Sequence, residues 1–116
     1  MIASSSSGLL GSRLREGCRF PGRVLVGHPF NPPHLIPLVE VVAHARTRPE
    51  DVQRVMAFYR LVGKKPMLLR KEVPGFVANR LQSALLREAV LNTHLIETTV
   101  PGVPVRFQVT AVWRKP

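Results

Sequence analysis

The sequence predicts an α/β fold, because short β-type apolar runs alternate with a helical pattern along most of the chain. Three apolar runs at residues 23–27, 38–43 and 66–70 are bounded by Pro or Gly turn signals and predict strands. Between the second and third runs, residues 47–63 have the 3–4 spacing of apolar side chains that an amphipathic helix shows. With 45% hydrophobic residues in 116, the chain can form a core, and this order fits the back half of an α/β sheet.

The N-terminal residues predict the end of a strand followed by a polar loop. Residues 1–3 have the strand character, 4–8 form the Ser-rich loop, and 9–16 predict a short helix with Gly17 at its C-terminal cap. A chain that opens at the end of a strand is unusual for a whole protein. We therefore expect an N-terminal part to precede these residues.

The helix predicted over 47–63 has signals at both of its ends. Thr47 and Glu50 have the spacing of a capping box, and Pro49 suits a first helical turn. Gly63 ends the pattern. The expected apolar face consists of Val52, Val55, Met56, Tyr59 and Val62.

A second long helix is predicted after the turn at Pro74 and Gly75, over residues 76–91. Its expected apolar side consists of Val77, Leu81, Ala84, Leu85 and Ala89. The tail, 92–116, changes character, since apolar residues alternate with others between 103 and 113 as in a strand. No partner strand for it is evident in the sequence.

The formal net charge of +10 predicts an affinity for anions. The basic residues are spread from Arg13 to Lys115, and the few aromatic residues do not interleave with them as a base-stacking surface requires, which disfavours nucleic acid. An anionic small substrate or cofactor explains the charge equally well, as does a compositional preference for Arg without a function.

Targeting and redox signals are sparse. The sequence shows no secretory signal and no apolar run of roughly 20 residues, so we expect no membrane association. Cys18 is the only cysteine, which excludes an internal disulfide and favours a cytoplasmic location. We assign its side chain to packing.

His28 is the strongest candidate for chemistry. It follows the apolar run 23–27 at the expected carboxyl end of a strand, where open α/β sheets place their sites. A histidine exchanges protons near neutral pH, and a carboxylate on its other ring nitrogen would fix its tautomer and orientation. Glu40 lies twelve residues further on, behind a proline-rich loop that could bring the next strand back beside the first.

Spacing alone favours a plainer interpretation, in which His28 is a loop histidine and Glu40 a solvated strand residue. The other histidines, His34, His44 and His94, do not share a ligand-like spacing with His28, so no metal site is predicted.

Three motifs change this balance. The chain contains the segment His28-Pro29-Phe30-Asn31-Pro32-Pro33, with Leu38-Val39-Glu40 after it, the earlier segment Ala3-Ser4-Ser5-Ser6-Ser7, and the later segment Val73-Pro74-Gly75-Phe76-Val77-Ala78-Asn79-Arg80-Leu81. In this order and at these separations, they resemble the signature segments of the 3-hydroxyacyl-CoA dehydrogenase family over about residues 2–90. The His-Pro-Phe-Asn-Pro-Pro variant resembles the branch that includes lambda-crystallin (L-gulonate 3-dehydrogenase).

The resemblance implies an NAD-dependent oxidation of a 3-hydroxyl group. By the family pattern, His28 is the general base, Glu40 orients it, and Ser7 and Asn79 bind the substrate oxygen. Neutral donors suit an oxygen whose negative charge grows as its proton leaves. The implied substrate is a 3-hydroxyacyl-CoA or a related 3-hydroxy acid, such as a gulonate-like acid or carnitine. The resemblance also implies a role in fatty acid metabolism and a homodimeric parent enzyme.

The resemblance further implies an organisation with three parts. We expect 1–73 to be the C-terminal part of a Rossmann-like NAD-binding domain, 74–91 the first helix of an all-helical domain, and 92–116 a divergent tail that does not resemble the family. Gly8 and Gly11 do not complete the G-x-G-x-x-G motif that holds a dinucleotide, so the cofactor-binding residues are unknown.

The missing motif bears on activity. We expect a truncated chain with little or no activity by itself. The alternative is a non-catalytic protein with a structural or polyanion-binding role, as crystallin recruitment in this family illustrates.

Overall fold

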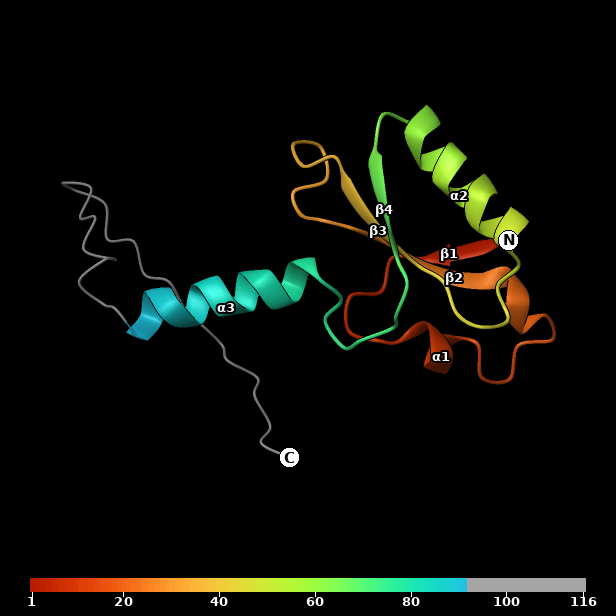
Figure 1. Cartoon of the computed structure of the whole chain (residues 1–116), viewed down its shortest axis with the longest axis horizontal. Helices are drawn as coiled ribbons and strands as arrows, with labels where there is room; N and C mark the ends of the chain where they lie inside the picture. Colours follow the sequence, from red (N-terminus) through yellow and green to blue (C-terminus); the bar gives the residue numbers. More distant parts are fainter. Residues whose placement is uncertain (92–116) are drawn as a thin grey trace. The chain divides into compact units, whose positions relative to one another are not determined.

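A computed structural model describes residues 1–91 of the chain (Figure 1). In chain order the elements are β1 (Ile2–Ser4), α1 (Gly11–Leu14), the 3₁₀ helix η1 (Pro21–Arg23), β2 (Val24–Pro29), β3 (Leu38–Val42), α2 (Pro49–Leu61), β4 (Lys65–Leu69) and α3 (Ala78–Leu91). The α/β class is confirmed. The predicted alternation at 103–113 and the divergent tail lie outside the described residues.

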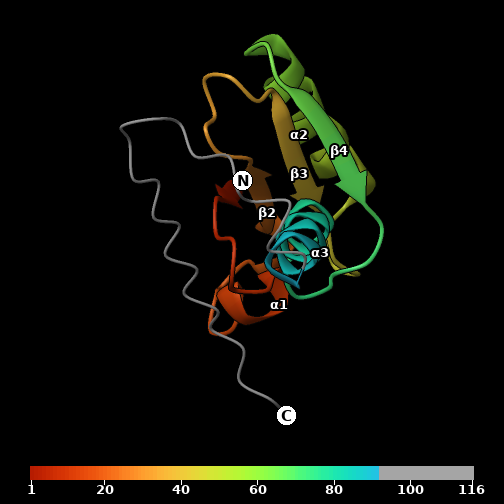
Figure 2. The ribbon, with the colours of Figure 1, turned by 90° about the vertical axis from the view of Figure 1, so that its left-hand side faces the viewer.

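The four strands form one mixed sheet in the order β1-β2-β3-β4. β1 is parallel to β2, β3 runs antiparallel to β2, and β4 is parallel to β3. Figure 2 shows β3 and β4 side by side with α2 behind them. Pro66 stands in β4, an edge strand, where a residue without an N–H group is tolerated.

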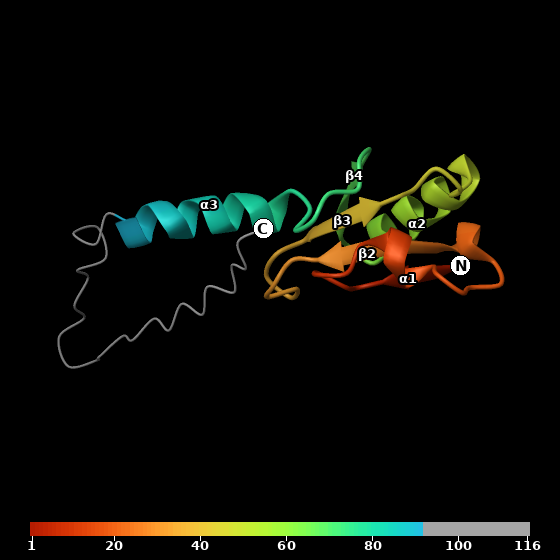
Figure 3. The ribbon, with the colours of Figure 1, turned by 90° about the horizontal axis from the view of Figure 1, so that it is seen from below.

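Side chains of the central strands alternate between two faces of the sheet, and each face has its own core. The first face packs against α2 through Leu25, Val39, Val41, Val52, Val55 and Met56. The second face packs Val26, Val42 and Leu69 against Phe76 and Leu14. Figures 1 and 3 show α1 and α2 on opposite sides of the sheet. His28 and Glu40 have the parity of Val26 and Val42, and therefore lie on the face away from α2.

Two local predictions are wrong. The N-cap of α2 is Arg48 and makes no side-chain capping bond, while Thr47 Oγ1 accepts a hydrogen bond from the backbone N–H of His44 instead. The capping box therefore does not form, because Thr47 closes the preceding turn. Cys18 is exposed, with its Sγ 3.6 Å from the Leu14 carbonyl, so its side chain does not pack in a core.

The chain divides into two compact units. Met1–Ser83 contains the whole sheet, α1, α2 and the start of α3. The second unit begins at Ala84, and its described part is the remainder of α3. The boundary expected between residues 73 and 74 stays a prediction. No helix of the described residues is long and apolar enough to span a bilayer.

Candidate active site

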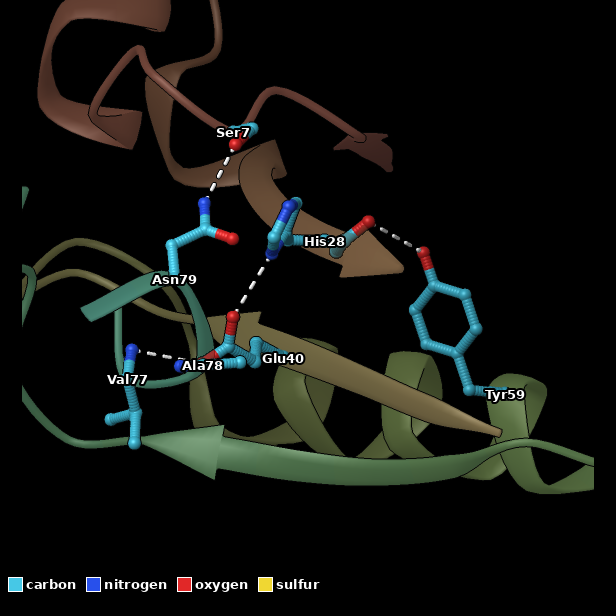
Figure 4. Close-up of polar contacts among 8 residues, drawn as sticks. Ser7, His28, Glu40, Tyr59, Val77, Ala78 and Asn79 are labelled. Atoms are coloured by element: carbon cyan, nitrogen blue, oxygen red, sulfur yellow. Dashed lines mark hydrogen bonds and ion pairs between the residues drawn. The ribbon is translucent and has the colours of Figure 1, made fainter. Parts of the chain in front are cut away.

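His28 and Glu40 face each other across the antiparallel pair of β2 and β3. They are register partners in the sheet, so the proline-rich loop between the strands brings them directly opposite. His28 Nδ1 lies 2.9 Å from Glu40 Oε2 (Figure 4). The exposed fractions are 6% for His28 and 0% for Glu40, so the interpretation of Glu40 as a solvated strand residue is excluded.

The second carboxylate oxygen of Glu40 accepts two backbone hydrogen bonds. Oε1 accepts hydrogen bonds from the backbone N–H groups of Val77 and Ala78, both at 2.9 Å. These N–H groups lie at the start of α3, where backbone donors are unpaired within the helix and favour a negative charge. A buried carboxylate is costly unless such donors surround it.

These contacts determine the tautomer of His28. A carboxylate can only accept hydrogen bonds, so Nδ1 of His28 carries a proton and donates to Glu40. In the neutral ring, Nε2 then has a free lone pair. Figure 4 shows this nitrogen on the edge of the ring away from Glu40.

The ring of Phe76 packs against His28. Its centroid lies 5.3 Å from that of His28 with the planes tilted by 52°, and Phe76 is 1% exposed. Phe76 has a φ of 51°, the left-handed region, which costs a non-glycine residue roughly 1–2 kcal/mol. Gly75 before it also has a positive φ of 75°.

Ser7 and Asn79 form a second pair. Asn79 Nδ2 donates to Ser7 Oγ at 2.8 Å, although the residues are 72 positions apart in the chain. Because Ser7 Oγ is the acceptor, its own hydroxyl hydrogen is free to point elsewhere. Asn79 lies in the first turn of α3, immediately after Ala78, whose N–H group binds Glu40.

One cavity of about 370 Å³ joins the two pairs. It is lined by Ser5, Ser7, His28, Pro29, Phe30, Asn31, Asn79 and Gln82. The structure thus brings three of the predicted site residues to one cavity, with Glu40 buried behind His28. A hydroxyl group placed there could meet a base and neutral hydrogen-bond donors together.

A tyrosine supports the strand from the opposite face. Tyr59 Oη on α2 is 3.5 Å from the carbonyl oxygen of Gly27, the residue before His28. A Cβ on Gly27 would lie 2.2 Å from that hydroxyl oxygen, so only glycine permits this approach. Burial raises the pKa of the Tyr59 phenol.

Three parts of the site were not predicted from the sequence: Phe76, the amides of Val77 and Ala78, and Tyr59. The signal available for the amides was the Pro-Gly turn, which predicted a helix start at this point but not its partner. A contact between Glu40 and residues 37 positions away leaves no mark on local periodicity.

The described residues lack the G-x-G-x-x-G segment that holds the pyrophosphate of a dinucleotide. At the start of α1, Glu72 Oε1 accepts the N–H of Ser12 at 2.8 Å, so this N–H already has a carboxylate partner. A Cβ on Gly11 would meet that same oxygen at 3.0 Å, whereas a Cβ on Gly8 would have nothing within 4 Å. No cluster of three or more His, Cys, Asp or Glu side chains that could hold a metal occurs in residues 1–91.

Comparison with known proteins identifies the family. Residues 1–73 match the model of the 3-hydroxyacyl-CoA dehydrogenase NAD-binding domain. A 3-hydroxyacyl-CoA dehydrogenase of Gibberella moniliformis is 61% identical over 90 residues, covering 77% of this chain and 28% of the relative. An L-carnitine dehydrogenase of Streptomyces griseus is 53% identical over 103 residues, covering 89% of this chain and 31% of the relative. The chain spans about a third of the length of these curated relatives.

Solved structures agree. 5-Formyl-3-hydroxy-2-methylpyridine 4-carboxylic acid 5-dehydrogenase, described as an NAD⁺-dependent dismutase, superposes with a TM-score of 0.74 at 40% identity, covering 82% of this chain and 31% of that one. The (S)-3-hydroxybutyryl-CoA dehydrogenase of Ralstonia eutropha superposes with a TM-score of 0.71 at 32% identity, covering 82% and 34%. The motifs of the sequence, the mixed Rossmann-like sheet and these matches lead to one conclusion: the chain belongs to the 3-hydroxyacyl-CoA dehydrogenase family.

Proposed function

We propose that this segment forms the proton-transfer side of a dehydrogenase site that oxidises the 3-hydroxyl group of an acyl-CoA or a related 3-hydroxy acid. The observation that carries the proposal is the 2.9 Å bond from His28 Nδ1 to buried Glu40, which leaves Nε2 as a base beside the cavity. The imidazole is thereby held in one tautomer before the substrate arrives.

The proton step follows from this arrangement. His28 Nε2 accepts the hydroxyl proton of the substrate while the carbon bearing that hydroxyl loses hydride, so the C–O single bond becomes a carbonyl. NAD, when bound, supplies the hydride acceptor. Glu40 stabilises the imidazolium that His28 becomes, as a buried aspartate does in a serine-protease triad.

Ser7 and Asn79 bind the substrate oxygen in this proposal. Asn79 already donates one amide hydrogen to Ser7 Oγ, which polarises the Ser7 hydroxyl toward donation. We propose that Ser7 directs its hydrogen at the reacting oxygen, with the second amide hydrogen of Asn79 beside it. Both groups are uncharged, so they stabilise developing charge without neutralising the base.

The proposed substrate class rests on the relatives. They are named for 3-hydroxyacyl-CoA and for L-carnitine, which is itself a 3-hydroxy acid. The net charge of +10 suits the polyanionic CoA group of an acyl-CoA, whereas L-carnitine is a zwitterion and offers a positive surface only its carboxylate. A role in fatty acid metabolism, a cytoplasmic location and a homodimeric parent enzyme remain proposals of the same origin.

We also propose that the 116-residue polypeptide by itself turns over little or no substrate. The reason is that it has no G-x-G-x-x-G segment, the motif that holds the pyrophosphate of a dinucleotide. Absorbance at the reduced-cofactor wavelength, with NAD and 3-hydroxybutyryl-CoA, checks this. A rate typical of the family would overturn the proposal of inactivity.

Substrate binding tests the site itself. In an NMR titration of the chain with 3-hydroxybutyryl-CoA and with L-carnitine, we expect shifts at His28, Ser7 and Asn79. Ser7→Ala should reduce the affinity, whereas Ser83→Ala, an exposed serine on α3 that does not line the cavity, should not. Shifts confined to the basic residues, or equal behaviour of the two variants, would contradict the assignment.

A further inference from the structure

Phe76 lies next to both members of the His28–Glu40 pair, through its ring on one side and its backbone on the other. Its ring packs on His28, and its backbone immediately precedes the two N–H groups that bind Glu40. It is also the only non-glycine residue with positive φ among residues 1–91. A strained backbone conformation persists only where the surrounding structure maintains it, and such residues cluster at functional sites.

The packing explains what maintains the conformation. Phe76 is 1% exposed and belongs to the apolar cluster with Val26, Val42 and Leu69 on the site face of the sheet. The N–H group of Phe76 donates to the carbonyl of Val73 at 3.0 Å, which closes the turn around Gly75. The buried ring therefore holds in place the turn of residues 73–76, whose last residue, Phe76, has a left-handed backbone.

The conformation has a direct consequence for Glu40. The chain reverses at Gly75 and Phe76, and the next two N–H groups converge on one carboxylate oxygen at 2.9 Å each. Two neighbouring N–H groups that meet one acceptor form a small anion-binding concavity. The other Glu40 oxygen is then left for His28 Nδ1 alone.

The ring has a separate consequence for His28. A histidine held only by Nδ1 could swing about that bond, but the centroid of the Phe76 ring lies 5.3 Å from that of His28, with the planes tilted by 52°, so the Phe76 ring occupies one side of the imidazole. Glu40, the partner of this imidazole, is 0% exposed.

We propose that Phe76 is a positioning residue for the reaction, because its buried ring and left-handed backbone hold the His28–Glu40 pair in the orientation that leaves Nε2 at the cavity. The inference rests on the proposed function, since it assigns to Phe76 the alignment of the proposed base. Phe76 does not line the cavity and acts only through His28 and Glu40.

NMR of the 116-residue chain with ¹⁵N-labelled histidine tests this inference. In Phe76→Leu, which keeps apolar bulk and loses the ring, we expect the ratio of the Nδ1–H to the Nε2–H tautomer of His28 to fall about tenfold, the effect of weakening one net hydrogen bond. Amide exchange of Val77 and Ala78 should accelerate by a similar factor. Phe20→Leu, which changes an exposed phenylalanine, should leave both quantities unchanged.

The outcomes separate the two proposals. If wild-type His28 is the Nε2–H tautomer, the proposed function fails whatever the variants show. If wild type is Nδ1–H and Phe76→Leu behaves as Phe20→Leu does, only the inference fails.

Folding of the variants is checked by amide dispersion, with Phe76→Met as a second variant. If neither variant folds, two measurements on the wild-type chain test the inference instead. Ring-to-ring NOEs between Phe76 and His28, together with slow exchange of the Val77 and Ala78 amides, support the inference. Their absence overturns it.

Discussion

The antiparallel pair of β2 and β3 carries a histidine near each end, and the two have opposite hydrogen-bond states. His28, near the carboxyl end of β2, donates through Nδ1 to Glu40, and its Nε2 has no hydrogen-bond partner within residues 1–91. His44, after β3, has both nitrogens engaged. Its Nε2 lies 3.2 Å from the carbonyl oxygen of Pro21 and 3.0 Å from that of Val24, and its Nδ1 accepts the N–H of Arg46 at 3.0 Å.

The difference shows that partners, not residue type, decide what a histidine can do. Two carbonyl oxygens require a donor, so His44 is the Nε2–H tautomer, and its remaining lone pair is used by the backbone. His44 therefore stabilises the 44–47 turn, and neither of its ring nitrogens has a free lone pair that could accept a proton from a substrate. Among residues 1–91, His28 has one hydrogen-bond partner, Glu40, which binds Nδ1 and not Nε2, and His28 lines a cavity.

The largest expected effect is at the carboxylate that creates this difference. Glu40→Ala leaves buried His28 without its carboxylate partner and removes the acceptor of the part-buried Val77 and Ala78 amides, so we expect the free energy of unfolding to fall by about 3–5 kcal/mol. Urea denaturation measures it. Glu16→Ala, which removes an exposed carboxylate paired with Arg13, is the matched control and should cost about 0–1 kcal/mol. If the two variants lost the same free energy of unfolding, the buried His28–Glu40 pair would contribute no more to stability than an exposed ion pair does.

A smaller effect is expected at the other histidine. His44→Ala removes two backbone contacts at the start of β2 and a third to the Arg46 N–H in the turn after β3, and we expect a loss of about 1–3 kcal/mol of unfolding free energy. The His28 tautomer should stay the same, because the two rings share no partner. A change in the His28 ring signals of a folded His44→Ala variant would show that the two ends are coupled, contrary to the comparison.

The third prediction compares two glycines, one of which, Gly27 in β2, lies against Tyr59. Gly27→Ala places a methyl group against the Tyr59 hydroxyl and should destabilise the fold by about 1–3 kcal/mol through overpacking. Gly8→Ala, at a position with nothing within 4 Å, is its control. Thermal unfolding of the two variants measures the difference. If the two melt together, α2 does not pack as tightly on this strand as described.

The smallest effect lies beside the His44 turn and depends on pH. The hydrogen bond from Arg48 Nε to Asp51 Oδ2, at 2.9 Å, lowers the pKa of the Asp51 carboxyl. A carboxyl with a lowered folded pKa stabilises the fold fully above its unfolded pKa, about 3.9, and loses that contribution as the pH falls through the folded value. The stability difference between wild type and Asp51→Asn should therefore shrink as the pH drops below about 4. A difference that stays constant from neutral to acidic pH would contradict this linkage.

Local patterns were sufficient for most of the elements and for naming His28 as a candidate, but the role of base for His28 came from the resemblance to a family and stays a proposal. Alternating apolar runs predicted β2 and β3, and periodicity predicted α2, within a few residues. The pairing of His28 with Glu40 needed the sheet register, which spacing alone left open. The resemblance to a family, not local physics, selected Ser7 and Asn79.

The remaining features depend on contacts that are distant in sequence. Glu40 accepts hydrogen bonds from amides 37 and 38 positions away, and the left-handed Phe76 packs its ring among Val26, Val42 and Leu69. The capping box failed for a similar reason, since Thr47 had a competing partner in the His44 N–H group. Propensity describes what a residue can do, and tertiary neighbours decide among the options.

The tautomer of His28 tests the central claim most directly. Long-range ¹H–¹⁵N spectra of the ring, at about pH 8 where a free imidazole is neutral, distinguish Nδ1–H from Nε2–H. We expect Nδ1–H in the wild-type chain. In Glu40→Gln the amide oxygen should take the two backbone N–H groups and the amide nitrogen should donate to Nδ1, which moves the ring proton to Nε2. His44 should remain Nε2–H in both proteins. A wild-type His28 that is protonated on Nε2, or a tautomer that ignores Glu40→Gln, would contradict the claim that Glu40 holds His28 ready as a base.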